Sequence, residues 1–281
     1  MNPSIRRLTF LSIALISMTS MAHADTVDGQ VGVNPNIANA TRQWTFGLGI
    51  LNQNYSEYNN GIVPSLPAIL DSETGDITSF RFSYTAMSNR LYLQAILNYS
   101  VGSTAYTGYL QSGSPVVFTP LTTKTSNNIF EILGRAGYAY NLSHSVVVIP
   151  YAELGEYLWI RDVGSSTPYG ISEDYFNFSL GVGAKALYSP ADRLVLELGM
   201  GYGLNFLSSM SAGGYDFTLG NEPYMNVYAS VDYRIDPRWH LILSADYRNW
   251  KYGQSQVIGG YLEPDSETTQ RQYLVSLGYQ F

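Results

Sequence analysis

The chain ends in Tyr273-Leu274-Val275-Ser276-Leu277-Gly278-Tyr279-Gln280-Phe281, where a large apolar residue occupies every second position. Side chains of a β-strand point alternately to its two faces, so this stretch predicts a strand with one wholly apolar face. That face carries Tyr273, Val275, Leu277, Tyr279 and Phe281. We expect this strand to be the last element of the fold and to end in an aromatic residue.

The same alternation recurs upstream and predicts ten strands. In the segment 176–188, one face is apolar and aromatic throughout, whereas the other carries Asn177, Ser179 and Lys185. No segment after residue 24 shows helical periodicity. The strands are expected near residues 43–58, 76–88, 90–108, 126–141, 145–162, 172–188, 193–208, 222–235, 238–253 and 268–281.

The predicted connections alternate between short and long. Four are tight turns, at residues 88–89, 141–144, 190–192 and 236–237. Five are long loops, near residues 59–75, 109–125, 163–171, 209–221 and 254–267. Short turns on one side and long loops on the other are typical of outer-membrane barrels, whose termini lie on the periplasmic, short-turn side. The sequence therefore predicts an all-β fold, a ten-stranded antiparallel transmembrane up-and-down β-barrel over residues 43–281.

The first residues are typical of a secretory signal peptide. Arg6 and Arg7 precede an apolar stretch at residues 8–21, which is too short to cross a bilayer as a helix. Ala22 and Ala24 then form the small-x-small pattern that signal peptidase cleaves. We predict a cleaved signal peptide at residues 1–24, a periplasmic segment at 25–42 and the barrel at 43–281.

Composition separates a membrane barrel from a soluble one. Charged residues make up only 13% of the chain, and 24 residues are tyrosine. A soluble lipocalin-like barrel also alternates, but its water-facing surface would carry many lysines and glutamates. Here the polar face is mostly Gly, Ser, Thr, Asn and Gln, which suits a lumen. Aromatic residues bracket the apolar face at the short-turn ends, like the girdles of membrane barrels: Tyr140, Tyr188, Trp239, Tyr279 and Phe281.

Two absences exclude further classes of protein. The chain has no cysteine, which excludes a disulfide scaffold, a thiolate metal site and a lipoprotein anchor. No basic patch is present to neutralise phosphates, which excludes nucleic acid as a partner.

The aromatic last strand resembles the assembly signal of bacterial outer-membrane barrels, whose final aromatic residue the insertion machinery recognises. Over residues 43–281 the chain is similar in architecture to small outer-membrane β-barrels, including opacity-type proteins and the membrane domain of outer-membrane protein A. The resemblance implies the cell outer membrane as location. It also implies outer-membrane lipid, lipopolysaccharide and the barrel-assembly machinery as partners. Glu156 departs from the pattern because alternation points it toward lipid, so either a bulge resets the register or the strand has left the bilayer there.

The polar face is predicted to bring ten charged residues into the lumen. Five are cationic and five anionic, and a lumen this narrow requires them to pair. They form either a structural salt-bridge core or a narrow gated pore in which carboxylate–guanidinium pairs exchange partners. The set is Arg81, Glu131, Arg135, Glu153, Lys185, Glu197, Asp232, Arg234, Asp246 and Arg248.

Catalysis is not expected. Omptin-type proteases, which also have ten strands, use acidic residues and a histidine at the outer rim, and outer-membrane lipases pair a serine with a histidine. In this chain His23 leaves with the signal peptide, and His144 and His240 lie at predicted periplasmic turns. The acids Glu173-Asp174, Glu263, Asp265 and Glu267 are interpreted as a solvated surface. We predict no catalytic residue, metal site or cofactor.

Two functions remain open for a non-enzymatic barrel. A polar, charge-balanced lumen favours a narrow porin-like channel for a small solute, or a structural barrel. The apolar loops at 59–75 and 109–125 either close the mouth as a lid or offer a surface for a ligand. The alternative to the channel or structural barrel is therefore a surface adhesin or ligand-binding barrel.

Overall fold

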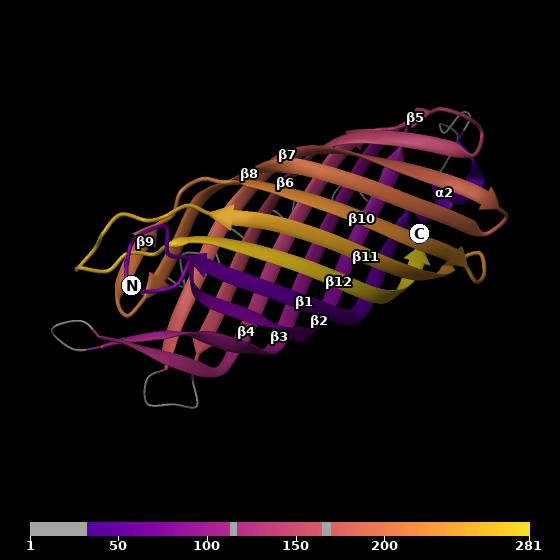
Figure 1. Ribbon diagram of the computed structural model, residues 1–281. Coiled ribbons are helices and arrows are strands. Elements are labelled where there is room, and N and C mark those ends of the chain that lie inside the picture. The colour runs from indigo at the N-terminus through magenta and orange to yellow at the C-terminus, as the bar shows by residue number, and fades with distance from the viewer. Residues whose placement is uncertain (1–32, 113–116, 165–169) are drawn as a thin grey trace. The chain divides into compact units, whose positions relative to one another are not determined.

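The computed structural model describes residues 33–112, 117–164 and 170–281, so the predicted signal peptide and its cleavage site at Ala22 and Ala24 lie outside the described residues. The strands form one antiparallel sheet in the order β10-β11-β12-β1-β2-β3-β4-β6-β7-β8-β9, and β8 also pairs with β10. This last pairing closes the sheet into a barrel (Figure 1). The wall strands are β1 (Gln43–Tyr58), β2 (Ile69–Ser88), β3 (Leu91–Ser112), β4 (Val117–Tyr138), β6 (Val146–Val163), β7 (Ile171–Ala191), β8 (Leu194–Ala212), β10 (Pro223–Arg234), β11 (Trp239–Tyr252) and β12 (Asp265–Gln280).

The predicted ten-stranded up-and-down barrel is confirmed. Each wall strand pairs with its neighbours along the chain, and β1 meets β12 over its whole length, from Gln43↔Gln280 to Tyr58↔Asp265. Two short strands, β5 (Tyr140–Asn141) and β9 (Tyr215–Thr218), extend the sheet at β6 and β8. Closure leaves the wall without a free edge, which is the condition for placing β-structure in hydrocarbon.

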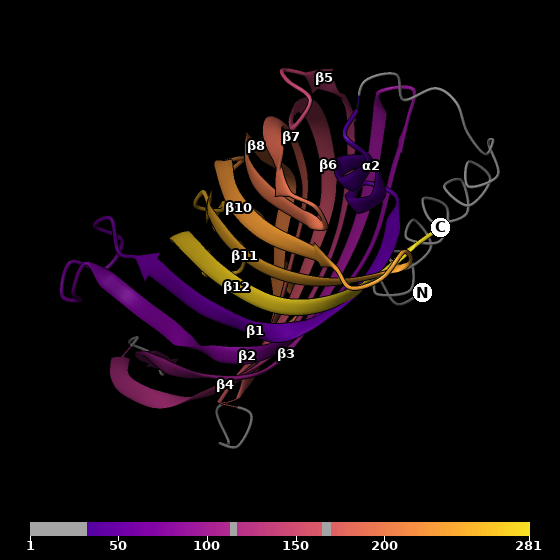
Figure 2. The same ribbon diagram turned by 90° about the vertical axis from the view of Figure 1, so that its right-hand side faces the viewer.

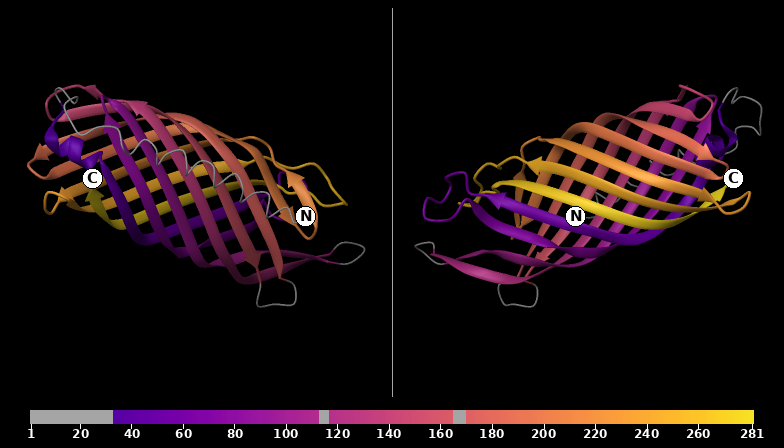
Figure 3. Two further views of the ribbon diagram at one scale, coloured as in Figure 1. Left: turned by 180° about the vertical axis from the view of Figure 1, so that it is seen from behind. Right: turned by 45° about the vertical axis from the view of Figure 1, so that its right-hand side comes forward.

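Three neighbouring strands are far longer than a bilayer requires. β2, β3 and β4 contain 20, 22 and 22 residues, about twice the 9–11 that span a membrane. The loop predicted at 109–125 is therefore wrong, because the β3–β4 ladder continues to Ser112↔Val117. The long β3–β4 hairpin projects from the end opposite the short turns (Figure 3). Its outer part is rich in threonine, which favours strands without forming an apolar face, so the alternation that marks the other strands is missing there.

The outward side of the barrel carries an exposed apolar belt. On β1 the outward residues Phe46, Leu48 and Ile50 are 59%, 51% and 48% exposed. Beyond them the outward positions become polar, and Asn52 donates a hydrogen bond to Asp76 (2.8 Å). A continuous apolar belt on a closed barrel is a lipid-facing surface. The protein is thus an outer-membrane barrel, with its long hairpins beyond the outer edge of the belt.

Aromatic side chains line both edges of the belt. At the short-turn end the Trp239 and Tyr279 rings lie 5.2 Å apart, and the Phe281 ring stacks on Tyr84 at 5.3 Å. The predicted girdle residues Tyr140 and Tyr188 are also exposed at that end. At the other edge further rings pair, such as those of Phe178 and Phe206 at 5.9 Å. The last strand presents its alternating face to lipid, while its role as an assembly signal stays a prediction.

The barrel also contains one helix that the sequence did not predict. Helix α2 (Pro35–Ala40) has six residues, which is too short to show an apolar period. Local chemistry sets its start, because Asn34 Oδ1 accepts a hydrogen bond from the Asn36 N–H (2.9 Å) and Pro35 occupies the first turn. Figure 2 looks toward the short-turn end, where α2 lies within the ring of strand ends. No helix in the described part of the chain is long and apolar enough to cross a membrane.

Glu156 points outward from a regular part of β6. β6 keeps an unbroken register with both neighbours, and Glu156 pairs with Ile132 on β4 and Phe178 on β7. A bulge in β6 is therefore the wrong explanation for Glu156. The irregularity lies instead between β7 and β8, near Leu207, whose φ is 51°. Because Phe178 belongs to the outer aromatic edge, Glu156 lies at the outer margin of the belt.

Candidate functional site

The interior of the barrel has three levels along its axis. Helix α2 and a cluster of apolar side chains, together with a few buried polar ones, fill the short-turn end. Charged and polar side chains fill the middle, and an aromatic layer fills the section toward the long hairpins. Inward positions of all ten strands contribute, because every second side chain of a barrel strand faces the lumen. The middle level is the candidate functional site, and the two layers around it decide its access.

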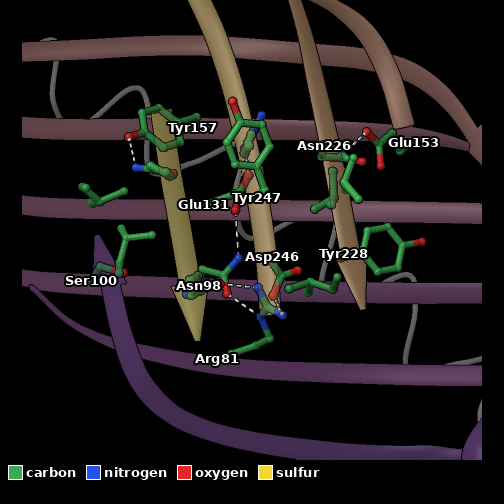
Figure 4. A pocket seen from close by; sticks show the side chains of 18 of the residues that line it. Arg81, Asn98, Ser100, Glu131, Glu153, Tyr157, Asn226, Tyr228, Asp246 and Tyr247 are labelled. Carbon is green, nitrogen blue, oxygen red and sulfur yellow. Dashed lines mark hydrogen bonds and ion pairs between the residues drawn. The ribbon is translucent and has the colours of Figure 1, made fainter. Parts of the chain in front are cut away.

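Eight of the ten predicted lumen charges form ion pairs in the middle level. Arg135 Nε lies 3.0 Å from Glu153 Oε2, and Lys185 Nζ lies 3.0 Å from Glu197 Oε2. Two other pairs cross the lumen between strands that are not neighbours. These are Arg81 with Asp246, at 3.0 Å, and Arg248 with Glu131. Figure 4 shows Arg81, Asn98, Asp246 and Glu131 in one hydrogen-bonded group.

The remaining two predicted charges lie closer to the periplasmic end. Asp232 Oδ1 lies 2.6 Å from His240 Nδ1, and Asp232 Oδ2 accepts a hydrogen bond from Gln43 (2.9 Å). Arg234 is the last residue of β10 and has no carboxylate partner in the described ranges. Sequence reasoning placed His240 at a turn, whereas its side chain is buried and faces inward. The alternation of the sequence could have predicted this orientation, because His240 lies between the outward residues Trp239 and Leu241.

Tyrosines that the sequence reasoning did not include complete the network around Arg135. The Arg135 guanidinium lies 4.4 Å from the centre of the Tyr228 ring, and Glu153 Oε1 accepts a hydrogen bond from the Tyr224 hydroxyl (2.6 Å). A glycine makes room for one of these rings. A Cβ at position 199 would lie 2.2 Å from Tyr228 Cζ, so only glycine fits there. Arg135 and Glu153 are 7% and 1% exposed, and they form the centre of the site.

Two small polar cavities remain between these side chains. The outer cavity has a volume of about 70 Å³ and is lined by the residues shown in Figure 4. The inner cavity has a volume of about 100 Å³ and reaches the C-terminal end of α2 at Ala40 and Thr41. Both are walled by Arg81, Arg135 and Asp246, which lie between them. Each has room for several water molecules.

An apolar layer closes the site on each side. Toward the periplasm, Ile37 of α2 is fully buried in a cluster that is completed by Met87, Tyr92, Ala139, Val147, Ile149, Leu187 and Val195. Toward the cell exterior a larger cluster includes Tyr157 and Trp250, whose rings meet edge to face at 5.1 Å. Tyr157 and Trp250 are 2% and 1% exposed. The polar middle level therefore lies between two packed layers. The outer seal is the layer of Tyr157 and Trp250, and in the periplasmic seal the Ile37 cluster is completed by the buried polar side chains of Gln43, Asp232 and His240.

A second charged cluster lies beyond the outer edge of the belt, and sequence reasoning missed it. Arg161 is fully buried and lies near four carboxylates, those of Glu73 (2.9 Å), Glu173 (2.5 Å), Glu57 (3.4 Å) and Asp71 (3.4 Å). The interpretation of Glu173 and Glu263 as solvated acids is wrong. Glu263 is 5% exposed and accepts a hydrogen bond from the Tyr175 hydroxyl (2.5 Å). The alternation that places Glu57 inward at the end of β1 continues on β2 at Asp71 and Glu73, and this pattern could have predicted the cluster.

This outer cluster holds more carboxyl groups than cations. Burial raises the pKa of Glu57, Asp71 and Glu173, and the neighbouring carboxyls add to the effect. Burial, with Glu173 nearby, raises the pKa of Glu263 to about 8. With several carboxyls facing a single guanidinium, Glu263 thus retains its proton near neutral pH. The described ranges contain no group of three or more His, Cys, Asp or Glu that is arranged to hold a metal ion.

Comparison with known proteins shows the fold. No family model matches the chain, and no curated protein matches its sequence. Among solved structures, the chain is similar to the outer membrane protease OmpT from Escherichia coli, with 12% identity and a TM-score of 0.56 over 92% of this chain and 99% of that one. An outer-membrane channel from Pseudomonas putida F1 also matches, with 12% identity and a TM-score of 0.40 over 91% and 100% of the two chains.

The likeness to a protease barrel concerns architecture alone, given the low identity. Of the three histidines, His23 lies outside the described residues, while His144 and His240 lie at the short-turn end. In the part of the chain that the structure describes, no histidine reaches the outer rim. The acids of that rim converge on Arg161.

Removing one member of the central pair should strongly destabilise the barrel. Arg135→Ala leaves Glu153 as a buried unpaired carboxylate, and we expect a loss of about 3–5 kcal/mol in the free energy of unfolding. The double variant Arg135→Met with Glu153→Leu should recover most of this loss. Urea unfolding, followed by the heat-dependent shift on SDS gels, measures both.

The control for the central pair is Lys251→Ala, which removes one partner of an exposed pair with a 4.0 Å separation. This change should cost less than about 1 kcal/mol. Equal losses for Arg135→Ala and Lys251→Ala would contradict the assignment of Arg135 to a buried network.

The outer cluster predicts a pH dependence of stability. A carboxyl whose pKa is raised on folding binds more protons in the folded state, so stability is full below about pH 4.5 and falls as the pH rises toward 8. Glu263→Gln should remove part of this slope and raise the melting temperature at pH 8.5 relative to the parent. Thermal melts between pH 5 and pH 9 test this.

The matched control for Glu263 is Asp162→Asn, at an outward position on β6. It should leave the slope of the melting temperature against pH unchanged. A flat pH profile for the parent would refute the proposed protonation of the cluster.

Proposed function

We propose that this protein is a non-enzymatic outer-membrane barrel with a structural, non-conducting lumen, and that its part beyond the membrane serves as a binding surface. The observation that carries the proposal is the packing of side chains on both sides of the polar middle level. A conduit needs an open path, whereas buried side chains fill this lumen at the Ile37 cluster and at the Tyr157–Trp250 layer.

The energetics of the middle level favour a structural role. Its charges are matched pairwise, and several have additional hydrogen bonds, as Glu153 has from Tyr224 and Asn226. Exchange of partners would first leave a charge unpaired in a buried space, which costs several kcal/mol. Such a network stabilises one arrangement of the strands and disfavours opening of the lumen to solutes.

The exterior supports a binding role for the projecting part. Apolar side chains are exposed at the tips of the hairpins and loops, beyond the polar outward positions that follow the belt, where lipid does not reach them. Ile69 is 47% exposed, Val117 55% and Val257 64%. Next to Val257, the Tyr261 and Tyr215 rings lie 5.6 Å apart and are both exposed. Exposed apolar and tyrosine side chains on rigid hairpins are typical of contact surfaces for other molecules.

Two observations weigh against catalysis in this part of the protein. The outer rim lacks a histidine in the described ranges, so the usual base for a serine or a water nucleophile is missing there. The rim acids point inward and are held by Arg161, Tyr55 and Tyr175. Their hydrogen bonds stabilise the hairpins and leave no acid beside a free nucleophile.

A gated channel is the second candidate. Two polar cavities lie between the seals, and the periplasmic seal depends on a helix of only six residues. Departure of α2 would connect the inner cavity to the periplasm. The outer aromatic layer would still have to open for solutes to pass.

Planar-bilayer conductance of the full chain separates these candidates. The parent should be silent, and so should Ile37→Asp, which breaks the periplasmic seal, because the outer seal remains. Trp250→Ala with Tyr157→Ala breaks the outer seal and should also be silent. The combination of all three changes should conduct.

The control for the conductance series is Leu142→Asp, which makes the same kind of change at a side chain that is 69% exposed in a periplasmic turn. It should remain silent alone and with the outer-seal changes. Steady conductance of the parent, or of Ile37→Asp alone, would refute the structural lumen and favour the gated channel.

The binding surface is tested with cells that display the protein. Replacement of Ile69, Val117, Val257 and Tyr261 by serine should lower attachment of these cells to polystyrene severalfold, because the exposed apolar area is lost. The amount of folded protein, read from the heat-dependent gel shift, should not change. The control variant Asn54→Ser with Thr74→Ser alters polar outward positions and should attach like the parent. Unchanged attachment of the serine variant would argue against a contact surface at these tips.

A further inference from the structure

Four arginines form an arc at the periplasmic end of the barrel. Arg42 lies between α2 and β1, Arg90 in the β2–β3 turn, Arg193 in the β7–β8 turn and Arg238 in the β10–β11 turn. The strands β7, β8, β10, β11, β12, β1, β2 and β3 follow one another around the wall, so successive arginine-bearing connections are neighbours along the short-turn rim. The connection between β4 and β6 completes the ring and carries His144 in place of an arginine.

None of the arginines of the arc has a carboxylate within 4.0 Å in the described part of the chain. No ion pair involves any of the four, whereas four cations of the lumen (Arg81, Arg135, Lys185 and Arg248) and Arg161 of the outer cluster are paired. The acidic groups nearest in the chain are Asp192, Asp236 and the C-terminal carboxylate. Asp236 Oδ1 is already used, because it accepts hydrogen bonds from the N–H groups of Arg238 (2.7 Å) and Trp239 (2.9 Å).

Two of the arginines occupy backbone positions that favour glycine or asparagine. The φ angles of Arg90 and Arg193 are 70° and 71°, in the left-handed region. Any side chain with a Cβ is disfavoured there relative to glycine. Both turns nevertheless carry a guanidinium, which the backbone geometry of the turn does not require. The conformation of these turns therefore does not explain why arginine occupies the two positions.

The arc borders the aromatic girdle of the belt. Arg238 Nη1 donates a hydrogen bond to the Tyr279 hydroxyl (3.4 Å), and the Tyr279 ring contacts Trp239. Arg42 precedes Gln43 and Trp44, and the Trp44 ring lies 4.3 Å from that of Tyr84. Tryptophan and tyrosine rings mark the depth of the lipid headgroups in a membrane. Guanidinium groups just beyond them lie at the level of the phosphates.

We propose that this arc binds the phosphate groups of anionic phospholipids in the periplasmic leaflet of the outer membrane. The planar guanidinium forms two parallel hydrogen bonds to a phosphate, which satisfies the charge that the protein leaves unpaired. A lipid fits better than a soluble phosphate, because the girdle and the belt beside the arc receive its acyl chains. The binding fixes the depth and tilt of the barrel in the membrane.

The test measures lipid retention by native mass spectrometry of the full barrel, released from mixed micelles of phosphatidylglycerol and phosphatidylethanolamine. The parent should retain phosphatidylglycerol preferentially. Each single change among Arg42→Gln, Arg90→Gln, Arg193→Gln and Arg238→Gln should lower this retention about fivefold. The quadruple variant should show no preference between the two lipids.

The matched control replaces the outward cations on the other side of the belt, as Lys124→Gln, Lys251→Gln and Arg271→Gln. It removes a similar charge and should keep the preference of the parent. The heat-dependent gel shift verifies that each variant is folded before its lipids are counted.

Three outcomes would overturn the proposal. The parent could retain the two lipids equally, or the control could lose the preference as fully as the quadruple variant does. Release of phosphatidylglycerol by millimolar inorganic phosphate, but not by chloride at equal ionic strength, would identify a site for free phosphate in place of a lipid surface.

Discussion

Pairing of β1 with β12 is the interaction on which the rest of the structure depends. It joins the two ends of the wall over sixteen residue pairs and gives every wall strand two neighbours. Without it, two strands would leave unpaired N–H and C=O groups in hydrocarbon, each at a cost of several kcal/mol. Closure also makes the interior narrow. A narrow interior forces inward charges to find partners, and the ion pairs of the middle level follow from that constraint.

Alternation was enough to predict the wall, because it is a local property of each strand. It identified the lipid face of β12 and the inward positions of Arg135 and Glu153. Pairing of charges is different, since it depends on how the strands are staggered around the ring. Arg135 lies directly opposite Glu153 on the adjacent strand, but Arg81 reaches Asp246 across the lumen from β2 to β11. A partner on a distant strand has no signature in the local sequence.

The sequence failed where the surroundings of a strand change from lipid to water. Beyond Asn52 and Thr78 the outward face becomes polar, so the period that reveals a strand in the belt disappears while the hydrogen-bonded ladder continues. The hairpins therefore looked like loops, and Arg161 with its four carboxylates was missed. Helix α2 was missed for another reason. Its six residues are stabilised by the cap at Asn34 and by the burial of Ile37, and neither contact produces an apolar period in the sequence.

Charge is handled in three different ways along the axis of this barrel. In the middle level, cations and anions are paired one to one. In the outer cluster, carboxyls outnumber the single guanidinium of Arg161, and raised pKa values let protons supply the balance. At the periplasmic end, the arginines of the arc have no carboxylate within ion-pair distance, and we propose that lipid phosphates supply the opposite charge. A barrel fold similar to that of a protease does not imply protease activity, because function depends on the side chains that the strands carry. In this chain the inward acids of the outer rim are bound to Arg161 and to tyrosine hydroxyls. The groups that could do chemistry on such a rim thus hold the long hairpins together.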